Sequence, residues 1–105
     1  MGVCALIEDP SDLSGEMFFK DVAEALAKIE VYDVDDTYLI DAFGDTFRIL
    51  PGDDPPPYHK GHLRLVCSQP DVLRKHMLLL ATEYLPDIEN AESHTTADLM
   101  FRMAG

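Results

Sequence analysis

Positive charge is scarce in this chain. Its 105 residues include eight Lys and Arg against twenty Asp and Glu, which gives a net charge of −12. Binding of nucleic acid or of an anionic lipid surface needs a concentrated positive patch, so the sequence argues against both partners. The charge is also uneven, because residues 1–54 have a net charge of −11 and residues 55–105 a net charge of −1. We therefore expect one strongly negative surface that attracts a basic protein partner.

Cysteine and long apolar runs are scarce as well. Cys4 and Cys67 lie in separate apolar segments without CxxC spacing, which is typical of free, buried thiols in a reducing compartment; a disulfide between them is the alternative. The longest apolar run, residues 77–81, is far too short to cross a bilayer. The first residues also lack the basic and apolar segments of a secretory signal. The sequence predicts a cytoplasmic protein with no membrane partner and a single domain over residues 1–105.

Apolar periodicity predicts an α+β fold. The segments with the composition or alternation of strands are residues 37–43, 46–50 and 62–67, with residues 3–7 as a candidate fourth. Gly44-Asp45 joins the first two and favours a hairpin with a II′-like turn, because Gly accepts a positive φ. Helical spacing marks residues 12–30, 70–85 and 96–104. We expect a three- to four-stranded antiparallel sheet with a central hairpin, two main helices packed on one face and a short C-terminal helix.

The acids of residues 30–54 are interleaved with aromatic side chains. This combination suits electrostatic steering followed by aromatic anchoring in a protein interface. We therefore predict a non-enzymatic binding protein of the immunity or inhibitor type, which engages a basic protein partner. The predicted partner surface consists of Tyr32, Asp33, Asp35, Asp36, Tyr38, Asp41, Phe43, Asp45, Asp53 and Asp54.

The last residues of the sequence are a second candidate contact surface, because apolar side chains gather where polar ones are usual. These residues are Leu99, Met100, Phe101 and Met103. One interpretation docks them onto the domain's own core. The other places them in a contact with a partner or a second copy, which predicts self-association as a homodimer or as a homo-oligomeric structural or regulatory subunit.

The stretch Val31-Tyr32-Asp33-Val34-Asp35-Asp36-Thr37-Tyr38-Leu39-Ile40-Asp41 resembles the first motif of haloacid-dehalogenase-type phosphotransferases, in which a short apolar strand ends in Asp-x-Asp-x-Thr. The resemblance implies that Asp33 is a nucleophile and Asp35 a general acid or base. It also implies that the pair helps to hold Mg²⁺, which offsets the repulsion between carboxylate and phosphate. Ser68 and Lys75 would then represent the second and third motifs. A Mg²⁺-dependent phosphohydrolase is therefore the alternative function, whereas an acidic turn before the hairpin needs neither catalysis nor a cofactor.

Metal binding and other catalytic motifs have little support in the sequence. His59, His62, Cys67 and His76 carry side chains that zinc prefers. However, they fall in a proline-rich loop, a strand and a helix, so no metal site is predicted. The sequence contains no nucleophile elbow, Walker loop or dinucleotide-binding glycine motif.

Overall fold

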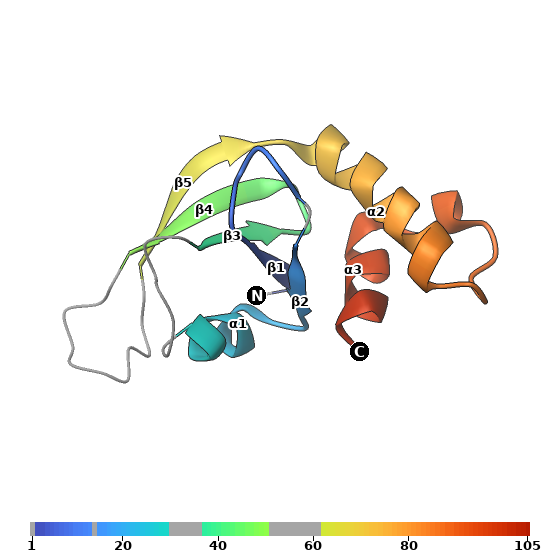
Figure 1. The fold of residues 1–105 in the computed structure, drawn as a ribbon, viewed down its shortest axis with the longest axis horizontal. Helices are drawn as coiled ribbons and strands as arrows, with labels where there is room; N and C mark the ends of the chain where they lie inside the picture. Colours follow the sequence, from blue (N-terminus) through green and yellow to red (C-terminus); the bar gives the residue numbers. More distant parts are fainter. Residues whose placement is uncertain (1, 14, 30–36, 51–61) are drawn as a thin grey trace.

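The computed structural model describes residues 2–13, 15–29, 37–50 and 62–105. In these residues an antiparallel sheet and three α-helices form an α+β fold (Figure 1). The strands are β1 (Cys4–Ile7), β2 (Met17–Phe19), β3 (Tyr38–Asp41), β4 (Asp45–Leu50) and β5 (His62–Ser68). The helices are α1 (Val22–Ile29), α2 (Pro70–Tyr84) and α3 (Thr96–Ala104), with the 3₁₀ turn η2 (Ala91–Ser93) before α3.

The sheet has the strand order β2-β1-β3-β4-β5, and each pair of neighbours is antiparallel. All four residues of β1 are buried. This agrees with its uninterrupted apolar sequence, since a strand covered on both faces needs no polar alternation. The α+β class, the antiparallel pairing and the hairpin of β3 and β4 confirm the prediction. The described residues form five strands, one more than the upper limit of the predicted three to four, because β2 was not recognised.

The prediction of one helix over residues 12–30 was wrong in its first half. Met17–Phe19 is the edge strand β2, with Phe18 opposite Ala5 of β1, and the helix begins only at Val22. Gly15 has φ +74, which interrupts a helix, and the Asp21 carboxylate accepts a hydrogen bond from the backbone N–H of Glu24 at the start of α1. The helical spacing of apolar residues was therefore misleading in this segment, because residues 17–19 pair with β1 as a strand.

The helices cover both faces of the sheet, which corrects the predicted arrangement on one face. Ala5 and Ile7 of β1 pack in a cluster with α2 and α3 residues such as Met77 and Leu99. Cys4 and Leu6 point to the opposite face and pack in a second cluster, with Ala25 and Ile29 of α1 among its members. Since successive strand residues point to opposite faces, β1 separates two layers of core.

The loop between β3 and β4 is held against the start of α2. Its residues are 42–44, and the Gly44 N–H donates to the Asp41 carbonyl oxygen, so the loop is one residue longer than the predicted II′-like turn. Gly44 has φ +86, and a Cβ added to it would lie 2.5 Å from Pro70 Cα. The Gln69 backbone N–H donates to the Gly44 carbonyl oxygen at 2.8 Å. The hairpin tip and the β5–α2 junction therefore form one tight contact.

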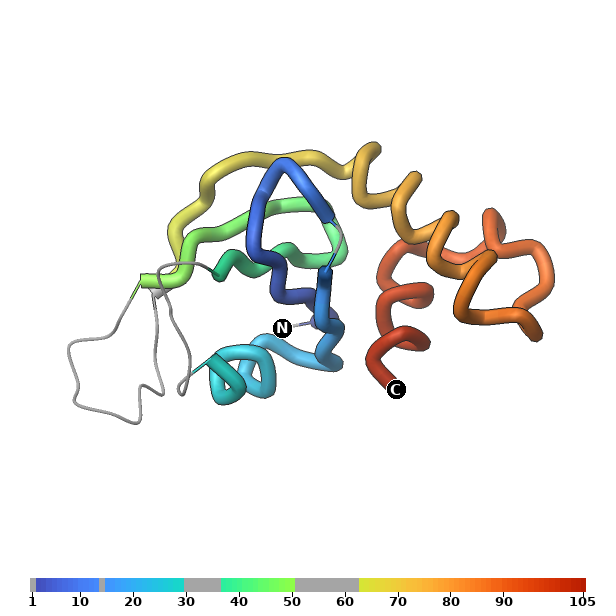
Figure 2. Tube along the Cα trace, in the orientation of Figure 1, coloured from blue at the N-terminus to red at the C-terminus, as the bar shows by residue number. Residues whose placement is uncertain are grey.

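After the sheet the chain runs outward along α2, reverses, and returns as α3 towards β2 (Figure 2). The predicted helix over residues 70–85 is confirmed as α2, and the short C-terminal helix is confirmed as α3. The Thr95 hydroxyl accepts from the Asp98 N–H and caps α3. Among the described helices, none has the length and apolar character that crossing a membrane requires.

The close approach at Gly44 generates a prediction with a matched control. Gly44→Ala should lower the free energy of unfolding by about 3 kcal/mol, since it combines a left-handed backbone with a clash against Pro70. Gly15→Ala should cost only about 1 kcal/mol, because its backbone is also left-handed but an added Cβ meets no atom within 4 Å. Urea denaturation of both variants measures the difference. Equal losses would contradict the role of the Pro70 contact.

Candidate functional site

Only part of the predicted partner surface falls within the described residues. Tyr32, Asp33, Asp35, Asp36, Asp53 and Asp54 lie outside them. Of the remaining four, Tyr38 is half-buried and packs against the core cluster on the α2 side. Asp41, Phe43 and Asp45 lie together at the β3–β4 loop, so the structure joins these three and separates Tyr38 from them.

Phe43 stands out from this loop. It is 78% exposed, the largest exposed fraction among the large hydrophobic side chains that the structure describes. The carboxylate of Asp41 accepts hydrogen bonds from the N–H groups of Phe43 (2.9 Å) and Asp45 (3.0 Å). Together with the Gly44–Pro70 contact, these bonds fix the backbone that presents the ring. An exposed aromatic side chain thus stands on a fixed loop backbone, with an acid on either side of it in the sequence.

Further acids gather at the same end of the sheet. Cys4 lies opposite Asp41 in the β1–β3 register, and its thiol donates to the backbone carbonyl oxygen of Asp21 at 3.7 Å. Burial, as the largest cause, and the negative charges of Asp21, Asp41 and Glu24 together raise the pKa of Cys4 to about 12. We call Asp21, Glu24, Asp41 and Asp45 the acidic end of the sheet. Within the described part of the chain, none of these four carboxylates forms an ion pair.

The C-terminal apolar residues divide between the core and the surface. Leu99 and Met100 are fully buried in the domain's own core, which supports the first of their two interpretations. Phe101 is half-exposed, with the Lys20 ammonium 5.3 Å from the centre of its ring. Met103 is partly buried and packs against the core cluster. Leu99 and Met100 therefore have no exposed surface to offer a second copy while the chain holds this fold.

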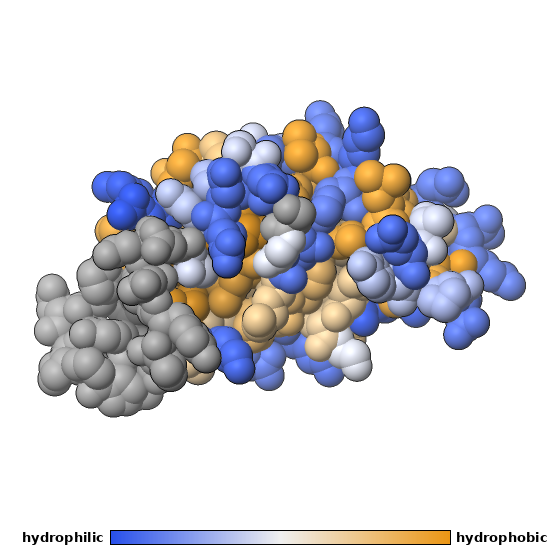
Figure 3. All heavy atoms as spheres, in the orientation of Figure 1, coloured by the Kyte–Doolittle hydropathy of each residue, from blue (hydrophilic) through white to orange (hydrophobic). Residues whose placement is uncertain are grey.

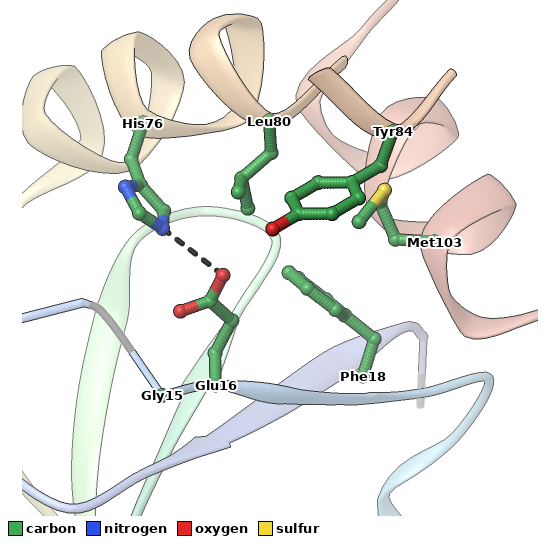
Figure 4. Close-up of a pocket in the computed structure, with 7 residues that line it drawn as sticks. All are labelled: Gly15, Glu16, Phe18, His76, Leu80, Tyr84 and Met103. Atoms are coloured by element: carbon green, nitrogen blue, oxygen red, sulfur yellow. Dashed lines mark ion pairs between the residues drawn. The ribbon is translucent and has the colours of Figure 1, made fainter. Parts of the chain in front are cut away.

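A cleft of about 400 Å³ lies between β2 and the two C-terminal helices (Figure 4). Glu16 and Phe18 rise from the β2 side, His76, Leu80 and Tyr84 descend from α2, and Met103 comes from α3. Figure 4 shows the Tyr84 hydroxyl turned towards the space between Glu16 and Phe18. Three polar groups therefore converge in a cleft whose walls are otherwise apolar, as is usual for ligand sites.

The deepest charged group of this cleft is Glu16, whose side chain is 10% exposed. Its Oε1 lies 3.2 Å from His76 Nε2. Within the described residues, Glu16 Oε2 and His76 Nε2 are both buried and have no aligned hydrogen-bond partner. A buried polar atom without such a partner costs roughly 1–3 kcal/mol, so both atoms favour a further donor or acceptor.

The structure brings together residues that the sequence did not connect. Glu16 and Phe18 lie in the segment whose apolar spacing predicts a helix over residues 12–30, and the only chemical signal of His76 in the sequence is a side chain that zinc prefers. Sixty residues separate Glu16 from His76, and no motif links them. In the part of the chain that the structure describes, no three His, Cys, Asp or Glu side chains are placed to share a metal ion.

Of the residues that carry the phosphotransferase resemblance, only some fall within the described residues. Asp33, Asp35 and Asp36 lie outside the described residues, whereas Ser68 ends β5 and Lys75 lies in α2. Comparison of the chain with protein-family models, curated proteins and solved structures finds no match. What the fold and geometry define is an α+β protein with an antiparallel sheet, an exposed aromatic loop beside acids, and a Glu–His cleft.

The environment of Cys4 predicts a large difference between the two thiols. A pKa raised from 9.0 to about 12 lowers the thiolate fraction at pH 8 roughly a thousandfold, and the thiolate is the reactive form. Both cysteines are free, and Cys67 is partly exposed. Iodoacetamide at pH 8 should therefore modify Cys67 of the native protein and leave Cys4 unmodified, as mass spectrometry of the peptides would show.

Two variants control this experiment. Cys67→Ser should remove the native labelling, and unfolding in urea should restore the labelling of Cys4. Modification of Cys4 at the rate of Cys67 in the native protein would contradict the described burial.

Proposed function

We propose that this chain is a non-enzymatic binding protein that engages a basic protein partner through Phe43 and the acidic end of the sheet. The observation that carries the proposal is the exposed ring of Phe43 on a loop whose backbone is fixed by hydrogen bonds to the Asp41 carboxylate. Aromatic side chains of this kind provide much of the binding energy in protein interfaces. A loop whose backbone is already fixed also loses less conformational entropy when it binds.

The charge distribution supports a basic partner rather than an acidic one. The acids at this end of the sheet have no cationic neighbours within ion-pair distance among the described residues, so their field extends into the solvent. The net charge of −12 adds to this field at longer range. Opposite charge on a partner accelerates encounter and selects against acidic competitors.

Other exposed hydrophobic side chains are the alternatives to Phe43 as a contact with a partner. In the view of Figure 3, exposed hydrophobic side chains form separate patches among hydrophilic ones. Large exposed hydrophobic residues besides Phe43 include Leu79 and Tyr84 on α2. The Phe43 loop differs from these residues because acids, Asp41 and Asp45, flank its exposed ring in the sequence.

The test starts from a partner captured at low salt and eluted at high salt, whose binding kinetics are then measured with purified variants. The association rate should fall roughly tenfold between low and high ionic strength. Phe43→Ala should weaken the equilibrium affinity about thirtyfold, as expected for a central aromatic contact. Asp45→Asn and Glu24→Gln should mainly slow association.

Leu79→Ala is the matched control, because Leu79 is also well exposed (62%) but lies on α2, away from the acidic end of the sheet. It should leave binding unchanged. A salt-independent association rate, or a Phe43→Ala variant that binds as the unaltered chain does, would refute the proposed surface.

A further inference from the structure

The cleft at Glu16 and His76 is distinct from the surface proposed for a basic protein. It lies between β2, α2 and α3, whereas Phe43 lies at the β3–β4 loop, and no residue belongs to both. Its volume of about 400 Å³ falls within the usual range for small-molecule sites. A second space of about 10 Å³ lies on the core side of the Glu16–His76 pair and has room for no more than one water molecule, so a ligand would occupy the outer cleft.

The charge of the cleft selects the class of ligand. Glu16 is the only acidic side chain among the described residues that line the cleft, no Lys or Arg is among them, and the one basic neighbour of Glu16 there is His76, whose Nε2 lies 3.2 Å from Oε1. A carboxylate offers about four acceptor positions, and the Oε2 atom of Glu16 uses none of its own. An anion entering this cleft would meet a buried carboxylate whose only basic neighbour among the described lining residues is His76. A positively charged group would instead be attracted to this carboxylate.

The walls of the cleft favour an organic cation over a bare metal ion. Phe18 and Tyr84 present aromatic rings, and Leu80 and Met103 add apolar surface. Aromatic faces attract ammonium groups, while the apolar walls bury the carbon body of a ligand. Two of the elements beside the cleft, β2 and α3, already show a contact of this kind. Lys20, which follows β2, lies over the ring of Phe101 in α3.

Lys20 does not itself fill the cleft. Glu16 precedes β2 and Lys20 follows it. The four residues from one to the other correspond to about 13 Å between their Cα atoms in an extended chain. The Lys20 ammonium is placed at the Phe101 ring and is not among the groups that line the cleft. The carboxylate of Glu16 is therefore left to His76 and to a ligand.

We propose that this cleft binds a small amine in its protonated form, with the ammonium group at Glu16 and an apolar or aromatic body against Phe18 and Tyr84. The imidazole of His76 orients the carboxylate from one side. The Tyr84 hydroxyl, which faces the same space in Figure 4, is available to a second polar group of the ligand.

Three probes of similar shape and different charge test this proposal: benzylamine, benzyl alcohol and benzoate. Benzylammonium should bind with a dissociation constant of about 1 mM and at least tenfold more tightly than either of the other two. NMR titration of the ¹⁵N-labelled protein should place the shifts at Glu16, Phe18, His76 and Tyr84. Equal binding of all three probes, absence of saturable binding, or shifts confined to the Phe43 loop would overturn it.

Two variants locate the interaction. Glu16→Gln keeps the shape of the side chain but removes its charge, so it should weaken benzylammonium binding at least tenfold. Glu83→Gln removes an exposed charge from α2 outside the cleft and should have no effect. Should Glu16→Gln fail to fold, Tyr84→Leu provides the second test, because Tyr84 is 62% exposed and we expect its replacement to leave the fold intact. Tyr84→Leu should weaken binding about threefold through loss of the aromatic face. Unchanged affinity in the folded variants would contradict the site.

A lysine side chain of a protein partner presents the same ammonium group on an aliphatic stem. Nα-acetyl-lysine methylamide therefore serves as a fourth probe. It should bind at least fivefold more weakly than benzylammonium if the cleft takes a small aromatic amine. Tighter binding of the lysine derivative would assign the cleft to a protein partner and overturn the small-ligand proposal. Because the Phe43 surface contributes nothing to these titrations, their outcome is independent of the proposed function.

Discussion

The burial of β1 on both faces is the constraint on which the rest of the structure depends. Its four residues send alternate side chains into two separate clusters, one beneath α1 and one beneath α2 and α3. Both edges of β1 are paired, with β2 on one side and β3 on the other. If a strand so deeply buried kept unpaired backbone groups, each would cost free energy, so β1 requires both neighbours. The two candidate sites follow from these two pairings.

Pairing with β3 creates the acidic end of the sheet. The register of Cys4 with Asp41 brings the end of β3 beside the start of α1, and with it the charges that act on the buried thiol. Carboxylates so close together repel one another. Part of this cost is offset locally, since Asp21 accepts a backbone hydrogen bond at the start of α1 and Asp41 accepts two in the loop. The same acids thus define local structure and leave a negative field outside, where a basic partner would reduce the repulsion.

Pairing with β2 creates the cleft. An edge strand exposes one row of side chains to whatever packs beside it, and here Glu16, Phe18 and Lys20 face α2 and α3. The cleft therefore depends on the return of α3 alongside α2, which places Met103 and Phe101 against β2. Leu99 and Met100 secure that return by their full burial. The apolar character of these two residues therefore has a structural cause.

The sequence by itself determined the elements whose pattern is local. The hairpin of β3 and β4, the strand β5, and the helices α2 and α3 were all recognisable from alternation, from helical spacing or from Gly44, because neighbouring residues carry those signals. The excess of negative charge and the exposed aromatic at Phe43 could also be proposed from sequence. Only the tertiary structure decided that residues 17–19 form a strand, that helices cover both faces, and that Glu16 meets His76. In each case the deciding interaction joins residues far apart in the chain. Apolar spacing in residues 12–30 was compatible with a helix, and the free edge of β1 selected the strand instead.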